Sequence, residues 1–320
     1  MIRLFKIAVL CTAAACATAT LAQEGAFPSK PVRLVVPFPA GNAGDIIARI
    51  VGDKMTASTK QSFYVDNRPG AGGNIGMENA VKSPPDGYTV LIAASGLLVA
   101  NPHLYKLSFD PVKDLAPVIL LFSGNTMLVV PQDSPFKTVH DLITYAKQNP
   151  GKLNYATYGA GHNSHLMGEK FKIAAGIDMK AVPYKTAPVT DVVAGRVEMM
   201  FESTGVAVPL MKAGRLRPLA LMGAKRNPGM PEVPSVAEEL PGFDAIGWAG
   251  ALVPAATPVA IVDTLNAQFN AALATAEVRQ RIQGLLLDPG GGKPADFAAF
   301  VKNEASGWEK VIHQANIKID

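Results

Sequence analysis

Cysteine is scarce in this sequence, because its 320 residues include only Cys11 and Cys16. Both lie within residues 1–22, which have the pattern of a secretory signal peptide: a basic start, an apolar run and small residues before Ala22. We predict cleavage after Ala22, which leaves an exported chain with neither a disulfide nor thiol chemistry. The alternative is a lipoprotein signal that ends at Cys16.

An excess of one charge is also missing. The chain has 30 basic and 26 acidic residues, or 28 and 26 once Arg3 and Lys6 leave with the signal peptide. A balance so close to neutral favours neither nucleic acid nor an anionic membrane as a partner. Beyond the signal peptide, no apolar run reaches the ~20 residues of a membrane span. We therefore expect a soluble, exported protein, long enough for two domains.

Motifs of the common enzyme classes are absent. A serine hydrolase carries its nucleophile in Gly-x-Ser-x-Gly, but Ser164 is flanked by Asn163 and His165. No carboxylate pair or phosphate loop stands out. Residues 70–76 are rich in glycine but lack the spacing of a dinucleotide loop, and we interpret them as a surface turn before a helix. The sequence supports neither an enzyme nor a cofactor.

Two histidines raise the possibility of a metal site. His162 and His165 are three residues apart, which suits one helix face, but only Glu169 offers a further ligand nearby. We expect no metal ion. Instead, His165 is predicted to pack or hydrogen-bond at a helix start, and His162 to lie at the rim of a loop.

Short apolar runs alternate with helical patterns, which indicates an α/β fold with a mostly parallel sheet. Strands are predicted at residues 32–36, 89–93, 127–130, 199–201 and 219–222. Helices are predicted at residues 46–54 and 138–148. Apolar stripes predict two later core helices, one with Val262, Leu265, Phe269 and Ala272, the other with Phe297, Phe300, Val301, Trp308 and Ile312.

Two glycine turns each join a predicted strand to a helix start. The first contains Gly41 and Gly44, and Asp45 is expected either to cap the following helix or to complement its dipole. The second spans residues 158–165 and contains further glycines. Backbone N–H groups at helix starts bind anions. Two such turns, in separate halves of the chain, predict a binding cleft whose two sides close on a carboxylate.

Further candidates follow other predicted strands. Glu202 lies where open α/β sheets bind ligands, and it suits a ligand ammonium or hydroxyl, or the cap of the next helix. Lys185 is either a partner for an anionic ligand or a solvated lysine. Trp248 is either a core residue or a wall of the pocket.

Six sequence blocks, in order, span nearly all of the exported chain. They are Phe-Pro-Ser-Lys-Pro at 27–31, Val-Pro-Phe-Pro-Ala-Gly at 36–41, Asn-Arg-Pro-Gly-Ala-Gly-Gly-Asn-Ile-Gly at 67–76, Pro-Asp-Gly-Tyr at 85–88, Asn-Pro-Gly-Lys-Leu-Asn-Tyr at 149–155 and Val-Pro-Tyr-Lys at 182–185. In these blocks the chain resembles the Bug family, the extracytoplasmic solute receptors of tripartite tricarboxylate transporters.

The resemblance implies a periplasmic binding protein of two α/β domains in the type II arrangement. Each domain is a mostly parallel sheet flanked by helices, and the ligand lies in the cleft between them. We expect residues 26–125 and 248–320 to form one domain and residues 126–247 the other. The implied partners are a small carboxylate and membrane permease subunits, and the chain is expected to be a monomer without a cofactor.

The expected ligand contacts combine the two loops that match the family, within residues 38–45 and 158–165, with candidates on other segments. They are Phe38, Ala40, Gly41, Asn42, Asp45, Ser95, Tyr158, Gly159, Ala160, His162, Asn163, Ser164, His165, Tyr184, Glu202, Ser203 and Trp248.

Three features depart from the family pattern at this site. Asn42 stands where a second glycine is usual and Gly44 where Thr or Ser is common. Glu202 replaces an aspartate, and the segment after Lys185 is shorter. With aromatic residues nearby, the ligand is expected to be a dicarboxylate or an aromatic carboxylate. The alternatives are a receptor that signals to a sensor partner and an exported enzyme that uses His162 or Glu202 as acid or base.

Overall fold

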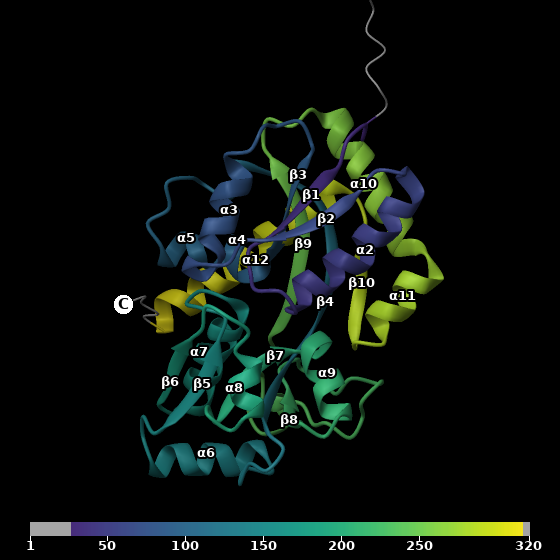
Figure 1. Ribbon diagram of the computed structural model, residues 1–320. Helices are drawn as coiled ribbons and strands as arrows, with labels where there is room; N and C mark the ends of the chain where they lie inside the picture. The colour runs from purple at the N-terminus through teal and green to yellow at the C-terminus, as the bar shows by residue number, and fades with distance from the viewer. Residues whose placement is uncertain (1–26, 316–320) are drawn as a thin grey trace, which may run out of the picture.

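The computed structural model describes residues 27–315, in which strands and helices alternate (Figure 1). The predicted signal peptide lies outside the described residues. The first elements are β1 (Val32–Val36), α2 (Ala43–Thr59), β2 (Phe63–Asn67), η1 (Ala71–Gly73), α3 (Asn74–Val81), β3 (Thr89–Ala94), α4 (Ser95–Val99), α5 (Asn101–Leu104), β4 (Leu115–Pro131) and α6 (Val139–Gln148).

The second half has the same alternation. It contains β5 (Leu153–Thr157), α7 (Asn163–Ala175), β6 (Met179–Pro183), α8 (Val189–Val193), β7 (Met199–Ser203), α9 (Thr204–Lys212), β8 (Leu216–Leu221), η2 (Val236–Glu238), β9 (Ile246–Pro254), α10 (Val259–Ala274), α11 (Ala276–Gln283), β10 (Leu287–Gly291) and α12 (Pro294–Ala315). None of the helices in the described residues has the length and apolar character that a membrane crossing needs.

The strands form one curled sheet in the order β2-β1-β3-β9-β4-β7-β5-β6, with β8 and β10 also paired to β4. The outer groups β2-β1-β3 and β7-β5-β6 are parallel. Between them, β9 and β4 are antiparallel to their neighbours. The predicted α/β class is confirmed, and its parallel pairing applies to the outer strands.

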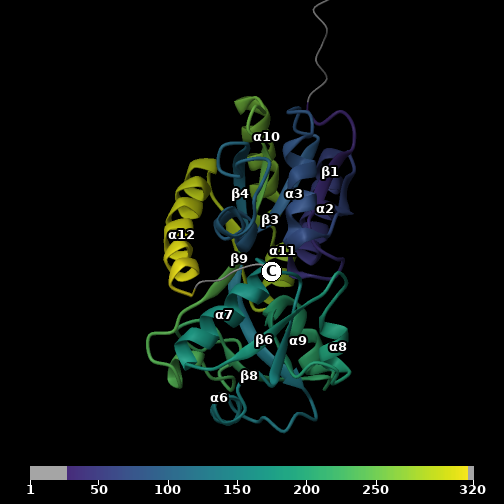
Figure 2. The same ribbon diagram turned by 90° about the vertical axis from the view of Figure 1, so that its left-hand side faces the viewer.

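Two lobes share this sheet (Figure 1). The upper lobe in that view contains β1, β2 and β3 with α2, α10 and α12, and the lower lobe contains β5 to β8 with α6 to α9. Figure 2 shows α12 along one side of the upper lobe and α2 with β1 on the opposite side. β4 passes between the lobes: it pairs with β9 and β10 as far as Asn125, and with β7 and β8 from Thr126 onward. The predicted domain boundaries, 125/126 and 247/248, fall within β4 and β9 and remain a prediction.

The apolar stripes correctly predicted two core helices, α10 and α12. All four predicted residues of α10 are buried. In α12, Phe297, Trp308 and Ile312 are buried, and Phe300 and Val301 pack against the core. Both helices are therefore core helices, as the spacing predicts.

Helix ends follow local capping. The side chain of Thr138, the predicted N-cap of α6, accepts a hydrogen bond from the Asp141 amide, and the Asp141 carboxylate accepts one from the Thr138 amide. For α2, the prediction began too late and ended too early. The helix starts at Ala43 because the side chain of Asn42 caps it, and it continues to Thr59.

Candidate functional site

A small cavity lies between the two lobes, with a volume of about 50 Å³. That space holds a few water molecules and is about a third of the ~150 Å³ that accommodates benzene in an apolar protein cavity. Its described lining is Phe38, Asn42, Ala43, Gly44, Ile92, Ala94, Phe122, Gly124, Asn125, Thr126, Tyr158, His162, Asn163, Ser164, Phe201, Glu202, Ser203, Gly247, Trp248, Ala249 and Leu287. Among these lining residues there is no lysine, arginine or aspartate.

Helix starts from both lobes reach this cavity. Gly44 lies in the first turn of α2, Ala94 precedes α4, Asn163 begins α7 and Ser203 caps α9, and all four line the cavity. The first N–H groups of a helix have no acceptor within the helix, and the helix dipole makes that end positive. The cavity therefore suits an anion without needing a basic side chain.

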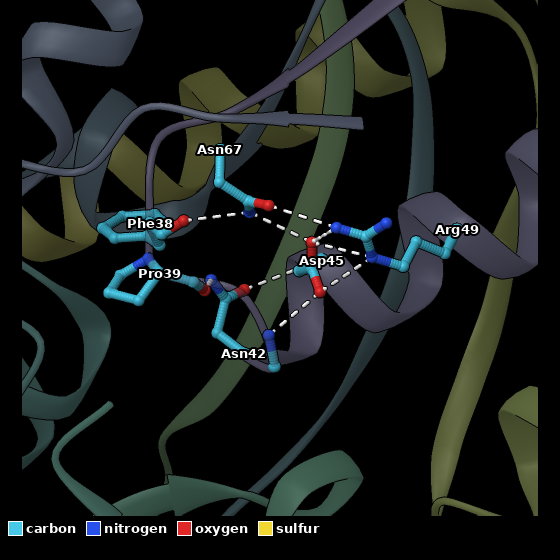
Figure 3. Close-up of polar contacts among 7 residues, drawn as sticks. Phe38, Pro39, Asn42, Asp45, Arg49 and Asn67 are labelled. Carbon is cyan, nitrogen blue, oxygen red and sulfur yellow. Dashed lines mark hydrogen bonds and ion pairs between the residues drawn. The ribbon is translucent and has the colours of Figure 1, made fainter. Parts of the chain in front are cut away.

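Asp45 holds the first glycine loop in place (Figure 3). Its buried carboxylate accepts hydrogen bonds from Arg49 Nη2 (2.9 Å), Asn67 Nδ2 (3.0 Å) and the backbone N–H of Gly41 (2.9 Å). Burial raises the pKa of this carboxyl, but the bonds from these donors outweigh it and lower the pKa below its ordinary value. Asp45 lies in the first turn of α2, whereas the N-cap is Asn42, whose Oδ1 accepts from the Asp45 amide (3.1 Å).

This network changes what the first loop can offer a ligand. The amide of Gly41 already binds Asp45, and Ala40 and Gly41 are exposed and do not line the cavity. By contrast, the hydrogen bonds of the described residues leave the amides of Ala43 and Gly44 available. The amides that this turn leaves available to a ligand therefore lie two to three residues beyond Gly41, at the start of α2.

His162 caps the second helix, α7. Its Nδ1 accepts a hydrogen bond from the Ser164 amide (3.1 Å), and its ring packs edge-on against Phe38 (ring centroids 4.5 Å apart) and beside Tyr158 (4.8 Å). Burial and the nearby His165 lower the pKa of His162 to about 3, so the ring is neutral at physiological pH. His162 is half-buried, lies at the end of the loop that precedes α7, and lines the cavity.

His165 lies in the first turn of α7. It is buried, and its Nδ1 accepts from the Gly161 amide (3.2 Å), so it packs at the helix start as predicted. Neither His165 nor Gly159 and Ala160 lines the cavity. The described residues contain no group of three or more His, Cys, Asp or Glu that could hold a metal ion.

Glu202 places a carboxyl group in the cavity. Its side chain is 3% exposed; Tyr158 Oη donates to Oε2 (2.8 Å) and the Ser203 amide donates to Oε1 (2.7 Å). Burial raises its pKa from 4.5 to about 7, although both hydrogen bonds act in the opposite direction. The sequence predicts its position at the end of β7, but its burial beside Tyr158 depends on the packing of α7 and β5.

The raised pKa predicts that Glu202 makes stability depend on pH. A carboxyl whose pKa is higher in the folded state destabilises the fold increasingly as pH rises from about 4.5 to about 7. Compared with Glu202→Gln, the wild type should therefore lose about 2 kcal/mol of unfolding free energy between pH 5 and pH 8. Urea unfolding of both proteins measures this, and an equal difference at the two pH values would contradict it.

The remaining predicted contacts divide into two groups. Ser95 donates to Asn163 Oδ1 (3.3 Å) and joins α4 to α7 without lining the cavity. Tyr184 is outside the cavity and donates to Asp191 (2.9 Å). Trp248 is mainly a core residue, 2% exposed, with Nε1 donating to Glu304, yet it also lines the cavity.

β4 contributes a part of the site that was not predicted from the sequence. Asn125 and Thr126 line the cavity, and Thr126 Oγ1 accepts a hydrogen bond from Asn163 Nδ2 (3.3 Å). Residues 123–126, Ser-Gly-Asn-Thr, are a polar interruption between two apolar runs. That interruption is the signal that marks where the strand passes the cavity.

Glycines allow the two lobes to approach closely beside the cavity. A Cβ at Gly96 would lie 2.2 Å from the Gly161 carbonyl oxygen, and a Cβ at Gly72 would lie 2.2 Å from that of Ala160. Tyr105 adds a direct bond, because its hydroxyl donates to the Ala160 oxygen (2.7 Å). Gly72 is buried, so the glycine-rich segment before α3 is an interlobe contact, and its prediction as a surface turn is wrong.

Comparisons with known proteins agree with this architecture. Residues 47–317 match the model of the tripartite tricarboxylate transporter family receptor. The chain is 40% identical to the UPF0065 protein in the tcbD-tcbE intergenic region of a Pseudomonas species, over 90% of this chain and 87% of that protein. It is 30% identical to protein BugT of Bordetella pertussis, over 92% and 91% of the two chains.

Solved structures show the same fold. An R. palustris protein with adipate has a TM-score of 0.88 at 36% identity, covering 91% of this chain and 99% of that one. MatC from Rhodopseudomonas palustris with bound malate has a TM-score of 0.85 at 31% identity, covering 89% and 100%. The periplasmic binding protein BugD has a TM-score of 0.87 at 29% identity, covering 91% and 99%. With its sequence blocks, family match and fold in agreement, the chain belongs to the tripartite tricarboxylate transporter receptor family.

Proposed function

We propose that this protein is a periplasmic solute-binding protein that captures a small carboxylate between its two lobes. The observation that carries the proposal is the convergence of helix starts on a cavity without a basic side chain. The amides of Ala43, Gly44 and Asn163 are suited to a carboxylate, because charge-assisted hydrogen bonds in a water-excluded site are strong. Similar proteins of known structure hold adipate and malate, which are both dicarboxylates.

Binding requires the lobes to move apart first. A cavity of about 50 Å³ is too small for a six-carbon diacid, whereas typical ligand pockets have ~300 Å³ or more. β4 and β9 continue from one lobe to the other and are the natural place for a hinge. The ligand would enter an open form, and closure would bring the starts of α2 and α7 onto it.

A ligand panel tests the carboxylate class. The exported chain is heated alone and with adipate, malate, succinate or benzoate, and binders are then titrated by calorimetry. We expect at least one of these acids to raise the unfolding temperature, since a ligand that binds only the folded state stabilises it. Dimethyl adipate, which has the same chain without its charges, is the matched control. Equal stabilisation by the ester, or none by any acid, would contradict the proposal.

The walls of the cavity bear on the choice of acid. Phe38, Phe122 and Tyr158 contribute aromatic surface, and the β4 residues Asn125 and Thr126 contribute polar groups. A preference for benzoate over adipate would support an aromatic ligand, and the reverse order a dicarboxylate.

Delivery to membrane permease subunits of a tripartite transporter is the second part of the proposal, and it rests on family membership. The alternative is a receptor that passes its signal to a sensor partner. Uptake of a radiolabelled acid that binds, in cells with and without this protein, separates the two. Uptake that does not depend on the protein would favour the sensor.

A further inference from the structure

Glu202 stands out because it places a carboxyl group inside a cavity suited to carboxylates. It is 3% exposed and accepts from Tyr158 Oη (2.8 Å) and the Ser203 amide (2.7 Å). Neither donor is charged. A carboxylate has about four acceptor sites, so these two bonds leave it unsaturated.

Among the described residues that line the cavity with Glu202, none is a lysine or an arginine. The described residues around the cavity are neutral on β4, β9, β10 and the start of α2, and the titratable ones are Tyr158 and His162. His162 is neutral, with a pKa of about 3, and Tyr158 has a pKa raised by burial. Arg49, on α2, is bound to Asp45 outside the cavity. A ligand carboxylate would thus meet Glu202 with no positive side chain between them.

A second Tyr–Glu pair shows the contrasting arrangement. Tyr155 Oη donates to Glu169 (2.6 Å), on the α7 side of the core, and Lys172 Nζ also binds Glu169 (3.0 Å). There the carboxylate has a cation beside it, and it does not line the cavity. Glu202 lacks such a cation, and two carboxylates in one desolvated space cannot both remain ionised without a large penalty.

We propose that a carboxylate ligand enters this cavity together with one proton, which Glu202 holds in a hydrogen bond to the ligand. The inference rests on the proposed function. Glu202 takes the proton from solvent, and the resulting carboxylic acid donates its O–H to the ligand carboxylate; no covalent bond of the ligand changes. Burial already raises the pKa of Glu202 to about 7, so the proton is readily acquired near neutral pH.

Two consequences follow for ligand choice and pH. Protonated Glu202 is both a donor and an uncharged wall, so it favours a ligand that presents a carboxylate at that point over one that presents an ammonium group. Affinity should be nearly constant below pH 7 and fall about tenfold per pH unit above it, because each binding event then consumes one proton.

Calorimetry with adipate tests the inference. Adipate is titrated at pH 6.5 and 8.5 into wild type, Glu202→Gln and Glu169→Gln. Each titration is repeated in two buffers that hold that pH, differ in ionisation enthalpy and are not simple anions, such as HEPES and Tris at pH 8.5. At pH 8.5 we expect wild type and Glu169→Gln to take up about one proton per adipate. Glu202→Gln should take up none, keep the same affinity at both pH values, and bind more tightly than wild type at pH 8.5.

The outcomes separate this inference from the proposed function. Adipate binding without proton uptake at pH 8.5, or uptake that persists in Glu202→Gln, would overturn the inference alone. If adipate does not bind, the acid from the panel that binds most tightly takes its place. Failure of every carboxylate to bind at either pH would overturn both proposals.

Discussion

Replacing Gly96 by alanine is expected to weaken carboxylate binding about 100-fold in a protein that still folds. The new Cβ would lie 2.2 Å from the Gly161 carbonyl oxygen, in the other lobe, so it would hold the lobes apart and keep them from closing fully on a ligand. An anion held by one lobe alone loses the amides of the other. Two charge-assisted hydrogen bonds are together worth about 3 kcal/mol, which corresponds to the stated factor.

Gly176→Ala is the matched control for this variant. Gly176 ends α7 with a left-handed φ of 62°, but a Cβ there would meet nothing within 4 Å. It should cost about 1 kcal/mol of stability through backbone strain and leave affinity unchanged. Calorimetric titration of both variants with an acid that binds wild type gives the comparison. Wild-type affinity in Gly96→Ala would mean that the ligand does not require this interlobe contact.

Replacing Asp45 by alanine is expected to cost about 3 kcal/mol of unfolding free energy. The change leaves the Gly41 amide and the Asn67 side-chain amide without their buried acceptor and removes the partner of Arg49. Loss of one member of a buried ion pair costs about 3–5 kcal/mol, and the low end applies because Arg49 is 51% exposed. Binding should weaken as well, since the loop before α2 is no longer held.

The pH dependence of this loss identifies its cause. A carboxyl whose pKa is lowered in the folded state stabilises the fold above its ordinary pKa of 3.8, and this contribution is lost as pH falls through the folded value. The difference between wild type and Asp45→Ala, measured by urea unfolding, should therefore shrink below about pH 4. Glu277→Ala removes an exposed ion pair between α11 and Lys54 of α2, the helix that carries Asp45, and should cost far less because solvent screens such pairs. Equal losses in the two variants would contradict the role assigned to Asp45.

Local patterns predicted those elements whose signals lie in adjacent residues. The strand at 32–36 is a continuous apolar run, and α6 has a cap and a proline–glycine stop in its own sequence. By contrast, only residues 127–130 of β4 were predicted. Pro117 and Gly124 resemble strand breaks in sequence, yet β4 continues through them because β9 and β10 pair along its length.

In the candidate site too, some features follow from adjacent residues and others depend on residues distant in sequence. The position of Glu202 at a strand end follows from the sequence, and Asn42 and His162 were expected ligand contacts; all three line the cavity. Gly41 was an expected ligand contact, but its amide binds the Asp45 carboxylate. That amide binds the Asp45 side chain because Arg49 and Asn67 hold the carboxylate in place. Asn67 is on β2, so this contact depends on the folded chain and not on adjacent residues.

The sequence by itself determined the alternation of strands and helices, the cap of α6, the two glycine turns and the family. These depend on side-chain periodicity, on backbone conformation and on short blocks of residues, all of which are local. Only the tertiary structure decided which amides at the helix starts lack a partner, that Gly72 and Gly96 serve contact between lobes, and that Glu202 is buried in a cavity whose described lining has no lysine or arginine. The reason is physical: hydrogen-bond occupancy, close packing and desolvation are set by residues that are distant in sequence and meet only in the folded chain.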